Sequence, residues 1–111
     1  MSKNIKDLGS GGNLYLVLIY DISLSSDEDM HKEDSRILRT VFKICKRYLT
    51  HIQNSVFEGE LSESQLMELE LELKKYLRRD RDSCIIFKGR NDIWMQKEFL
   101  TKEINQTSQF L

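Results

Sequence analysis

The sequence predicts an α+β fold of the ferredoxin-like type, βαββαβ, with an antiparallel sheet and an extra carboxyl-terminal edge strand. Three observations predict it: a strongly apolar segment at 14–22, two amphipathic segments that begin near residues 35 and 62, and a short apolar segment at 83–88. Strand, helix, two short strands, helix and strand in this order form a split βαβ unit with both helices on one face of the sheet. The 111 residues are enough for one domain with a single core.

We expect a flexible leader at 1–13, the ferredoxin-like domain at 14–99, and a tail at 100–111 that contacts a partner or a second copy. The leader contains GSGG, which does not join a strand to a helix as a phosphate-binding loop would. It lacks the apolar core of a secretory signal, and no apolar run is long enough to span a membrane, so a cytoplasmic protein is expected. Cys45 and Cys84 lack CxxC spacing and are expected to be small buried hydrophobes.

The first half of the predicted domain contains one strand and one helix. Residues 14–22, LYLVLIYDI, are apolar until their end, which predicts a central strand buried on both faces. The polar stretch SLSSDEDMHKED lacks the D-x-D-x-D-G pattern of a calcium loop and is expected to be a solvated loop. SRILRTVFKICKRYL then has the period of an amphipathic helix. Its apolar face comprises Ile37, Leu38, Val41, Ile44, Cys45, Tyr48 and Leu49.

The second half begins with HIQNSVFEGEL, residues 51–61, which predicts two short strands or one bent ribbon, interrupted at Gly59. Ser62 and Gln65 form an S-x-x-Q capping box, which predicts the start of a second helix. Its predicted apolar face comprises Leu66, Leu69, Leu73 and Leu77. SCIIFK is expected to be a buried strand, and IWMQKEF the edge strand.

Five cations of the first helix fall within an arc of roughly 100°, opposite the apolar face. They are Arg36, Arg39, Lys43, Lys46 and Arg47. The formal net charge of −1 gives no global basic field, but no acid interrupts this stripe, whereas an ordinary solvated helix mixes signs. The stripe therefore indicates an anionic partner, with a solvated face as the alternative. No aromatic residue for base stacking accompanies it, which favours the backbone of duplex nucleic acid over a single strand.

Asp21 ends the first strand, where a carboxylate can do one of two things. It can bind Mg²⁺, which takes one or two protein carboxylates, and a two-fold dimer would supply a second Asp21. Alternatively, it can cap the chain by hydrogen bonds to the local backbone, which the residues alone favour. His31 and His51 are expected to be solvated or packing residues, so no clear general base accompanies Asp21.

Several segments together resemble one known family. YDIS at 20–23, the helix ending KRYL and, above all, HIQNSVFEGEL at 51–61 resemble the CRISPR-associated protein 2 family, the small subunit of the spacer-acquisition machinery. The resemblance spans nearly everything from Leu14 to the terminus. The loop SLSSDEDMHKED is longer than the usual link in this family.

The resemblance implies a ferredoxin-like homodimer in which Asp21 of both chains holds Mg²⁺ and is catalytic. It implies Mg²⁺-dependent endonuclease activity on RNA or DNA, and assembly with the larger CRISPR-associated integrase. It also implies that duplex DNA lies across a basic surface, for which the candidates are Arg36, Arg39, Lys43 and Arg47. Two functions follow as alternatives: an adaptor that bridges integrase dimers during spacer integration, and a metal-dependent endoribonuclease that acts on its own on single-stranded RNA.

Overall fold

Six elements follow one another in the computed structural model of the chain, which describes residues 13–90 and 96–101. They are β1 (Leu14–Asp21), α1 (Glu28–Tyr48), β2 (Thr50–Gln53), β3 (Val56–Leu61), α2 (Glu63–Lys74) and β4 (Ser83–Gly89). The strands form a sheet of order β2-β3-β1-β4 in which all neighbours are antiparallel. The predicted βαββαβ order and ferredoxin-like arrangement are confirmed.

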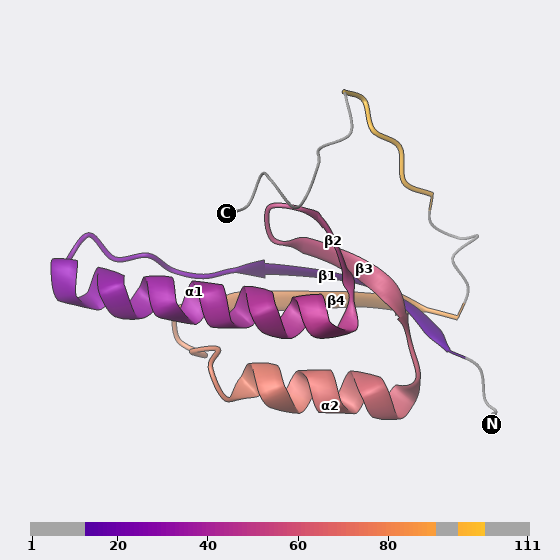
Figure 1. The fold of residues 1–111 in the computed structure, drawn as a ribbon, viewed down its shortest axis with the longest axis horizontal. Helices are drawn as coiled ribbons and strands as arrows, with labels where there is room; N and C mark the ends of the chain where they lie inside the picture. The colour runs from indigo at the N-terminus through magenta and orange to yellow at the C-terminus, as the bar shows by residue number, and fades with distance from the viewer. Residues whose placement is uncertain (1–12, 91–95, 102–111) are drawn as a thin grey trace.

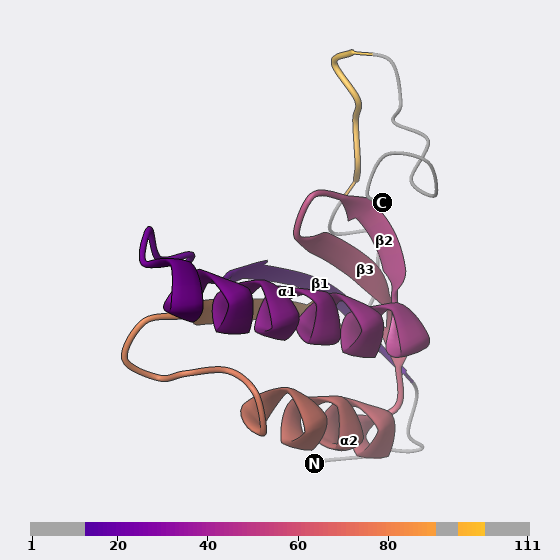
Figure 2. The ribbon, with the colours of Figure 1, turned by 60° about the vertical axis from the view of Figure 1, so that its left-hand side comes forward.

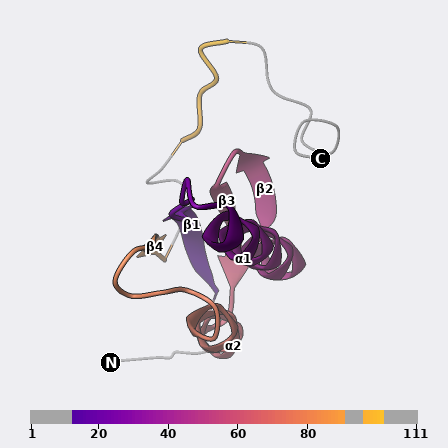
Figure 3. The same cartoon turned by 90° about the vertical axis from the view of Figure 1, so that its left-hand side faces the viewer.

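Both helices pack on the same face of the sheet (Figures 1 and 3). They lie side by side there (Figure 2), so the core forms between them and one face of the strands. The most deeply buried residues come from every layer: Leu16 and Leu18 of β1, Val41 and Cys45 of α1, Phe57 of β3 and Leu69 of α2. This face of β1 and β3 is therefore sealed from water.

Within residues 13–90 and 96–101, no helix covers the other face of the sheet, which differs from the prediction that the first strand is buried on both faces. Side chains alternate along a strand, so Tyr20 points into the core while Ile19 and Asp21 lie on the open face. On β4 the same face carries Ile85 and Phe87, which are 52% and 51% exposed. Apolar side chains lie on both faces of β1, as predicted, but the described helices cover only one of these faces.

The polar stretch expected to be a loop is partly helical, because α1 begins at Glu28 instead of near residue 35. Asp27 caps this end: its Oδ1 accepts a hydrogen bond of 3.1 Å from the Met30 amide. Glu28 and Asp29 lie in the first turn, where acids favour the positive end of the helix dipole. The acids that suggest a solvated loop instead start a helix that extends beyond the strands (Figure 1).

The break between β2 and β3 lies at Asn54 and Ser55, not at Gly59 as predicted. Asn54 has φ 43°, a left-handed conformation that asparagine tolerates better than most residues. Gly59 lies within β3, where an added Cβ would come within 3.0 Å of Leu49 Cδ2. The glycine thus lets Leu49 pack closely against the sheet.

The predicted capping box is present at the start of α2. Ser62 Oγ accepts from the Gln65 amide at 3.2 Å, and Gln65 Oε1 accepts from the Ser62 amide at 2.9 Å. The helix ends at Lys74, earlier than the leucine pattern predicts, so Leu77 lies in the connection to β4. Arg78 and Arg79 therefore lie beyond the helix, and Arg78 contacts other parts of the chain.

The extra edge strand expected at 93–99 is not seen at residues 96–99, and 91–95 lie outside the described residues, as do most of the leader and the tail. Lys97 donates to Glu58 of β3, so the Lys97 side chain reaches the open face of the sheet at this point. No helix among residues 13–90 and 96–101 is long and apolar enough to cross a membrane.

Candidate nucleic-acid interface and metal site

All five predicted cations are exposed on α1, but some of them form ion pairs with acids. Arg36 donates to Glu33, with 2.6 Å between Nη2 and Oε2, and Arg47 donates to Glu72 of α2. Within the described part of the chain, Arg39, Lys43 and Lys46 make no ion pair; Lys46 Nζ lies 5.8 Å from the centre of the Phe42 ring. The uncompensated positive charge is therefore concentrated in the middle of the stripe.

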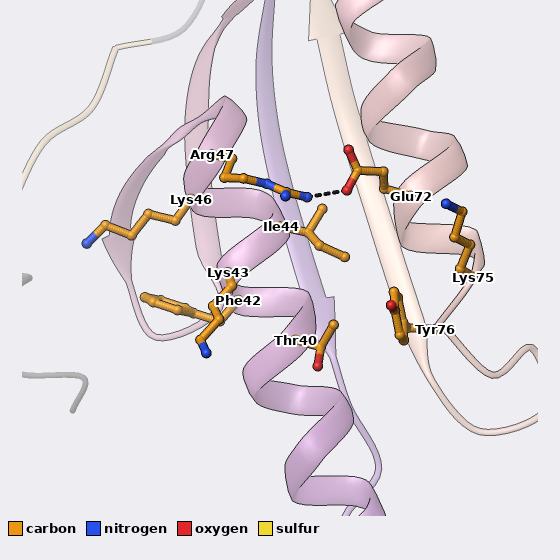
Figure 4. Close-up of a pocket in the computed structure, with 9 residues that line it drawn as sticks. All are labelled: Thr40, Phe42, Lys43, Ile44, Lys46, Arg47, Glu72, Lys75 and Tyr76. Carbon is orange, nitrogen blue, oxygen red and sulfur yellow. Dashed lines mark hydrogen bonds and ion pairs between the residues drawn. The ribbon is translucent and has the colours of Figure 1, made fainter.

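An open groove runs between α1 and α2 beside the stripe (Figure 4). It is lined by Thr40, Phe42, Lys43, Ile44, Lys46, Arg47, Glu72, Lys75 and Tyr76. Lys75 adds a cation from the second helix, and Tyr76 adds the aromatic neighbour that the stripe alone lacks. The sequence of α1 could not reveal either, because Lys75 caps the end of α2 and Tyr76 lies just beyond it.

Glu72 closes one end of the groove, where it holds Arg47 (Figure 4). The Tyr48 hydroxyl donates to Glu72 Oε2 at 2.5 Å. This hydrogen bond and the neighbouring Arg47 guanidinium hold the pKa of Glu72 below its usual value. Glu72 is thus charged at neutral pH, and Arg47 contributes less to the basic face than Arg39 or Lys43.

Asp21 lies at the end of β1, exposed on the open face of the sheet next to Ile19. Ser83 of β4 is its direct partner in the strand register, so the two side chains share this face. A single exposed carboxylate fits Mg²⁺, which prefers oxygen and accepts as few as one or two protein ligands. Residues 13–90 and 96–101 contain no group of three potential metal ligands from His, Cys, Asp and Glu, so one chain alone supplies few ligands for a metal ion.

Both histidines make structural contacts, as expected. His51 is buried against Phe42 and Phe57, with ring centres 4.9 Å apart in each pair, and its Nε2 donates to the Asn54 carbonyl at 2.8 Å. His31 Nδ1 lies 2.9 Å from the Ser25 carbonyl at the start of α1. Neither histidine is placed by these contacts as a general base beside Asp21.

Cys45 is buried in the core, as predicted, whereas Cys84 of β4 is only partly buried. Burial raises the pKa of Cys45 to about 12 and that of Cys84 to about 11. The reactive thiolate is therefore absent at neutral pH, and neither residue is a nucleophile.

A buried ion network that the sequence did not predict holds the chain just beyond Asp21. Arg78 donates from Nη1 to Asp34 of α1 and from Nε to Asp82 Oδ2, the latter at 2.9 Å. The exposed fractions of the three side chains are 19% for Arg78, 3% for Asp34 and 0% for Asp82. Arg78 also reaches the Ser23 carbonyl at 3.1 Å from Nη2. The network thus joins α1, the loop after β1 and the turn before β4.

The same geometry lowers the pKa of both carboxyls. The Arg78 hydrogen bond and the Ser25 amide, 2.7 Å from Asp34 Oδ2, hold the pKa of Asp34 below its usual value. Burial alone would raise the pKa of Asp82, but hydrogen bonds from Arg78 and from the Ser23 amide outweigh it and lower that pKa. Both acids are charged at neutral pH.

Comparison with known proteins identifies the family. The family model described as CRISPR associated protein Cas2 matches residues 14–97. The chain belongs to the Cas2 family. A Cas2 relative from Fusobacterium nucleatum subsp. nucleatum, named CRISPR-associated endoribonuclease Cas2, is 51% identical over 112 residues, covering 100% of both chains. CRISPR-associated endoribonuclease Cas2 2 of Moorella thermoacetica is 32% identical and covers 86% of this chain and 100% of its own.

Solved Cas2 structures share the fold. One, described as a crystal structure of Cas2, is 32% identical, with a TM-score of 0.66 over 82% of this chain and 90% of that chain. Streptococcus pyogenes Cas2 at pH 6.5 has a TM-score of 0.62 over 77% of this chain and 98% of its own, at 22% identity. The predicted family is confirmed, while the roles of Asp21 and of the basic side chains stay predictions.

The lowered pKa values of Asp34 and Asp82 predict a dependence of stability on acid pH. In the folded chain both carboxyls bind protons less readily than when unfolded, so their stabilisation is complete above the ordinary Asp value of about 3.9 and is lost as the pH falls towards their lower folded values. We expect Asp34→Asn to be less stable than wild type at pH 7 and the difference to shrink in acid. Thermal unfolding from pH 7 to pH 3 measures this.

Glu68→Gln is the control for this series, because Glu68 is exposed in the middle of α2. Its unfolding curve should follow that of wild type across the pH range. Parallel curves for wild type and Asp34→Asn would contradict the assignment of acid sensitivity to the network.

Proposed function

We propose that this Cas2-family chain is a CRISPR adaptation subunit that acts as a homodimer, binds duplex DNA on α1 and bridges integrase dimers during spacer integration. Mg²⁺-dependent cleavage of RNA or DNA at Asp21 is its second activity. One observation carries the proposal: the basic stripe lies on α1, whereas Asp21 lies on the open face of the sheet. A second copy on the open face leaves the helices of both copies free for nucleic acid.

The open face supports the homodimer because it carries large apolar side chains that are exposed in the described part of the chain. Ile19, Ile85 and Phe87 are exposed there, on neighbouring strands β1 and β4. Two copies that bury the same face against each other form a two-fold, isologous interface. Asp21 follows Ile19 on this face, so such an interface includes Asp21 of both copies.

Phe87→Glu should weaken the homodimer. Full burial of a phenylalanine side chain stabilises by about 1.5–3 kcal/mol, so its replacement by a charge should weaken self-association at least about tenfold. Light scattering over a dilution series measures the mass. Leu71→Glu is the matched control, because Leu71 is 59% exposed on α2, away from the sheet face. A variant Phe87→Glu that remains dimeric, or a wild type with the mass of one chain, contradicts this arrangement.

The basic stripe supports binding to the nucleic-acid backbone. Arg39 and Lys43 present uncompensated charge, and Lys75 extends it across the groove. Lysine and arginine side chains of this kind contact phosphates. Phosphate contacts position a protein on a duplex without reading its sequence. The stripe therefore fits a protein that holds DNA without reading its sequence.

Arg39→Ala with Lys43→Ala should weaken duplex binding equally for unrelated sequences. If each side chain neutralises one phosphate, the slope of log affinity against log salt should fall by about 1.8. Binding titrations at several salt concentrations measure both quantities. Arg79→Ala with Arg81→Ala removes the same charge from the connection before β4 and is the control. An unchanged slope in the α1 variant would move the DNA surface elsewhere.

Asp21 supports Mg²⁺-dependent cleavage as a single carboxylate ligand. A bound Mg²⁺ ion supplies Lewis-acid stabilisation of charge on a phosphodiester. Asp21 would hold it together with Asp21 of a second copy, and Ser83 lies beside it on the same face. With one acid per chain and no histidine placed as a base, cleavage should be slow. The alternative, an endoribonuclease that acts on its own, is favoured by the names of the relatives.

Asp21→Asn separates the two functions, because it removes the negative charge and changes the size of the side chain little. We expect Mg²⁺-dependent cleavage of RNA and duplex DNA to be lost, whereas spacer integration with the cognate integrase stays intact. Glu60→Gln is the control, because it removes a negative charge from the same face near the other end of β1. Loss of integration together with cleavage would show that the metal site serves adaptation itself. Cleavage that survives Asp21→Asn would contradict the catalytic role.

A further inference from the structure

We propose that Arg78 is a positioning residue for metal binding at Asp21. Its guanidinium clamps the backbone just beyond Asp21 and thereby fixes the direction of that carboxylate. The inference rests on the proposed role of Asp21 as a metal ligand, and it adds a residue from a different part of the chain. Arg78 belongs to the connection between α2 and β4, not to the strand that carries Asp21.

Arg78 and Asp82 together bind both backbone polar groups of Ser23, its carbonyl and its amide. Arg78 Nη2 donates to the Ser23 carbonyl at 3.1 Å, and the Ser23 amide donates to Asp82 Oδ1 at 3.0 Å. Asp82 is itself held by Arg78, through Nε at 2.9 Å and Nη2 at 3.0 Å. Ser23 is thus fixed at its amide and its carbonyl by one ion pair.

Asp21 lies between this clamp and a second fixed point. On its amino-terminal side the backbone pairs with β4, where Asp21 is opposite Ser83. On its carboxyl-terminal side Ile22 is buried with 6% exposure, and Ser23 is clamped. The two residues after the strand therefore cannot turn freely, although the Asp21 carboxylate itself is exposed. Metal ligands held in this way by surrounding hydrogen bonds bind metal more tightly than mobile ones.

A contribution to folding stability alone is a poor explanation for burying the ion pairs of Arg78 with Asp34 and Asp82. Burial of charged groups costs desolvation energy, and apolar side chains of similar size often stabilise as well or better. A planar guanidinium, however, can meet two carboxylates and a carbonyl at once in fixed directions, which an apolar side chain or a lysine cannot do. The geometry of the network thus favours a role in placement of the loop.

The charge of the network also suits a neighbouring cation. Arg78 faces two carboxylates, those of Asp34 and Asp82, so the buried group has a formal charge of −1. A negative group behind the end of β1 attracts a metal ion to the face where Asp21 is exposed.

The test compares Arg78→Lys with Arg79→Lys in the full-length protein, with Mn²⁺ as the probe for Mg²⁺. Both variants keep the charge, but Arg79 is exposed and makes no hydrogen bond or ion pair within the described residues. Isothermal titration with MnCl₂, below the unfolding temperature of every variant, should show affinity about 10- to 100-fold weaker for Arg78→Lys and unchanged for Arg79→Lys. Hydrogen exchange of the Ser23 amide should accelerate in Arg78→Lys alone.

Asp34→Asn is the second variant, for use if Arg78→Lys does not fold. It releases one side of Arg78 but leaves Asp82 in place, so Mn²⁺ affinity should weaken by a smaller factor. Asp21→Asn reports on the metal site itself. If Asp21→Asn loses Mn²⁺ while the folded network variants bind like wild type, the positioning role is wrong and the metal site stands. If Asp21→Asn binds like wild type, the metal site is wrong, and the positioning role with it.

Discussion

A four-stranded sheet with helices on one face has one constraint from which much else follows: its other face must stay polar or be covered by another molecule. In this chain β1 is central, and its alternating side chains divide between the two faces. Leu16 and Leu18 point to the helices, whereas Ile19 and Asp21 point away. Because Ile85 and Phe87 continue the apolar surface on β4, the face that carries Asp21 is also the face on which we propose that a second copy binds.

Local patterns predicted much of the fold. The apolar run of β1, the period of α1 and the Ser62 capping box each depend on neighbouring residues, and the structure contains all three. The predictions differ from the structure where one local sequence pattern is compatible with two structures. Acids before a helix can be solvated or can cap it, and here Asp27 makes a cap, so α1 begins earlier than expected. A glycine in a strand can break it or permit close packing, and Gly59 permits packing against Leu49.

The site was less predictable because its contacts join distant parts of the chain. The five cations of α1 were visible as a pattern, but Glu72, which neutralises Arg47, comes 25 residues later. Arg78 and Asp34 are 44 residues apart, and nothing in either segment indicates that they meet. The position of Asp21 at a strand end could be predicted from the sequence. Its place on the uncovered face required the tertiary arrangement of the helices.

The ion network gives α1 a role beyond its basic surface. The helix presents Arg39 and Lys43 to solvent, and from its amino-terminal part it presents Asp34 to Arg78. Arg78 in turn holds Ser23, two residues after Asp21. One continuous helix therefore connects the candidate DNA surface with the loop that supports the candidate metal ligand, although the two sites lie on opposite faces of the sheet. A change in how α1 packs on the sheet would reach both sites, whereas a substitution of its exposed cations leaves the network, and with it Asp21, in place.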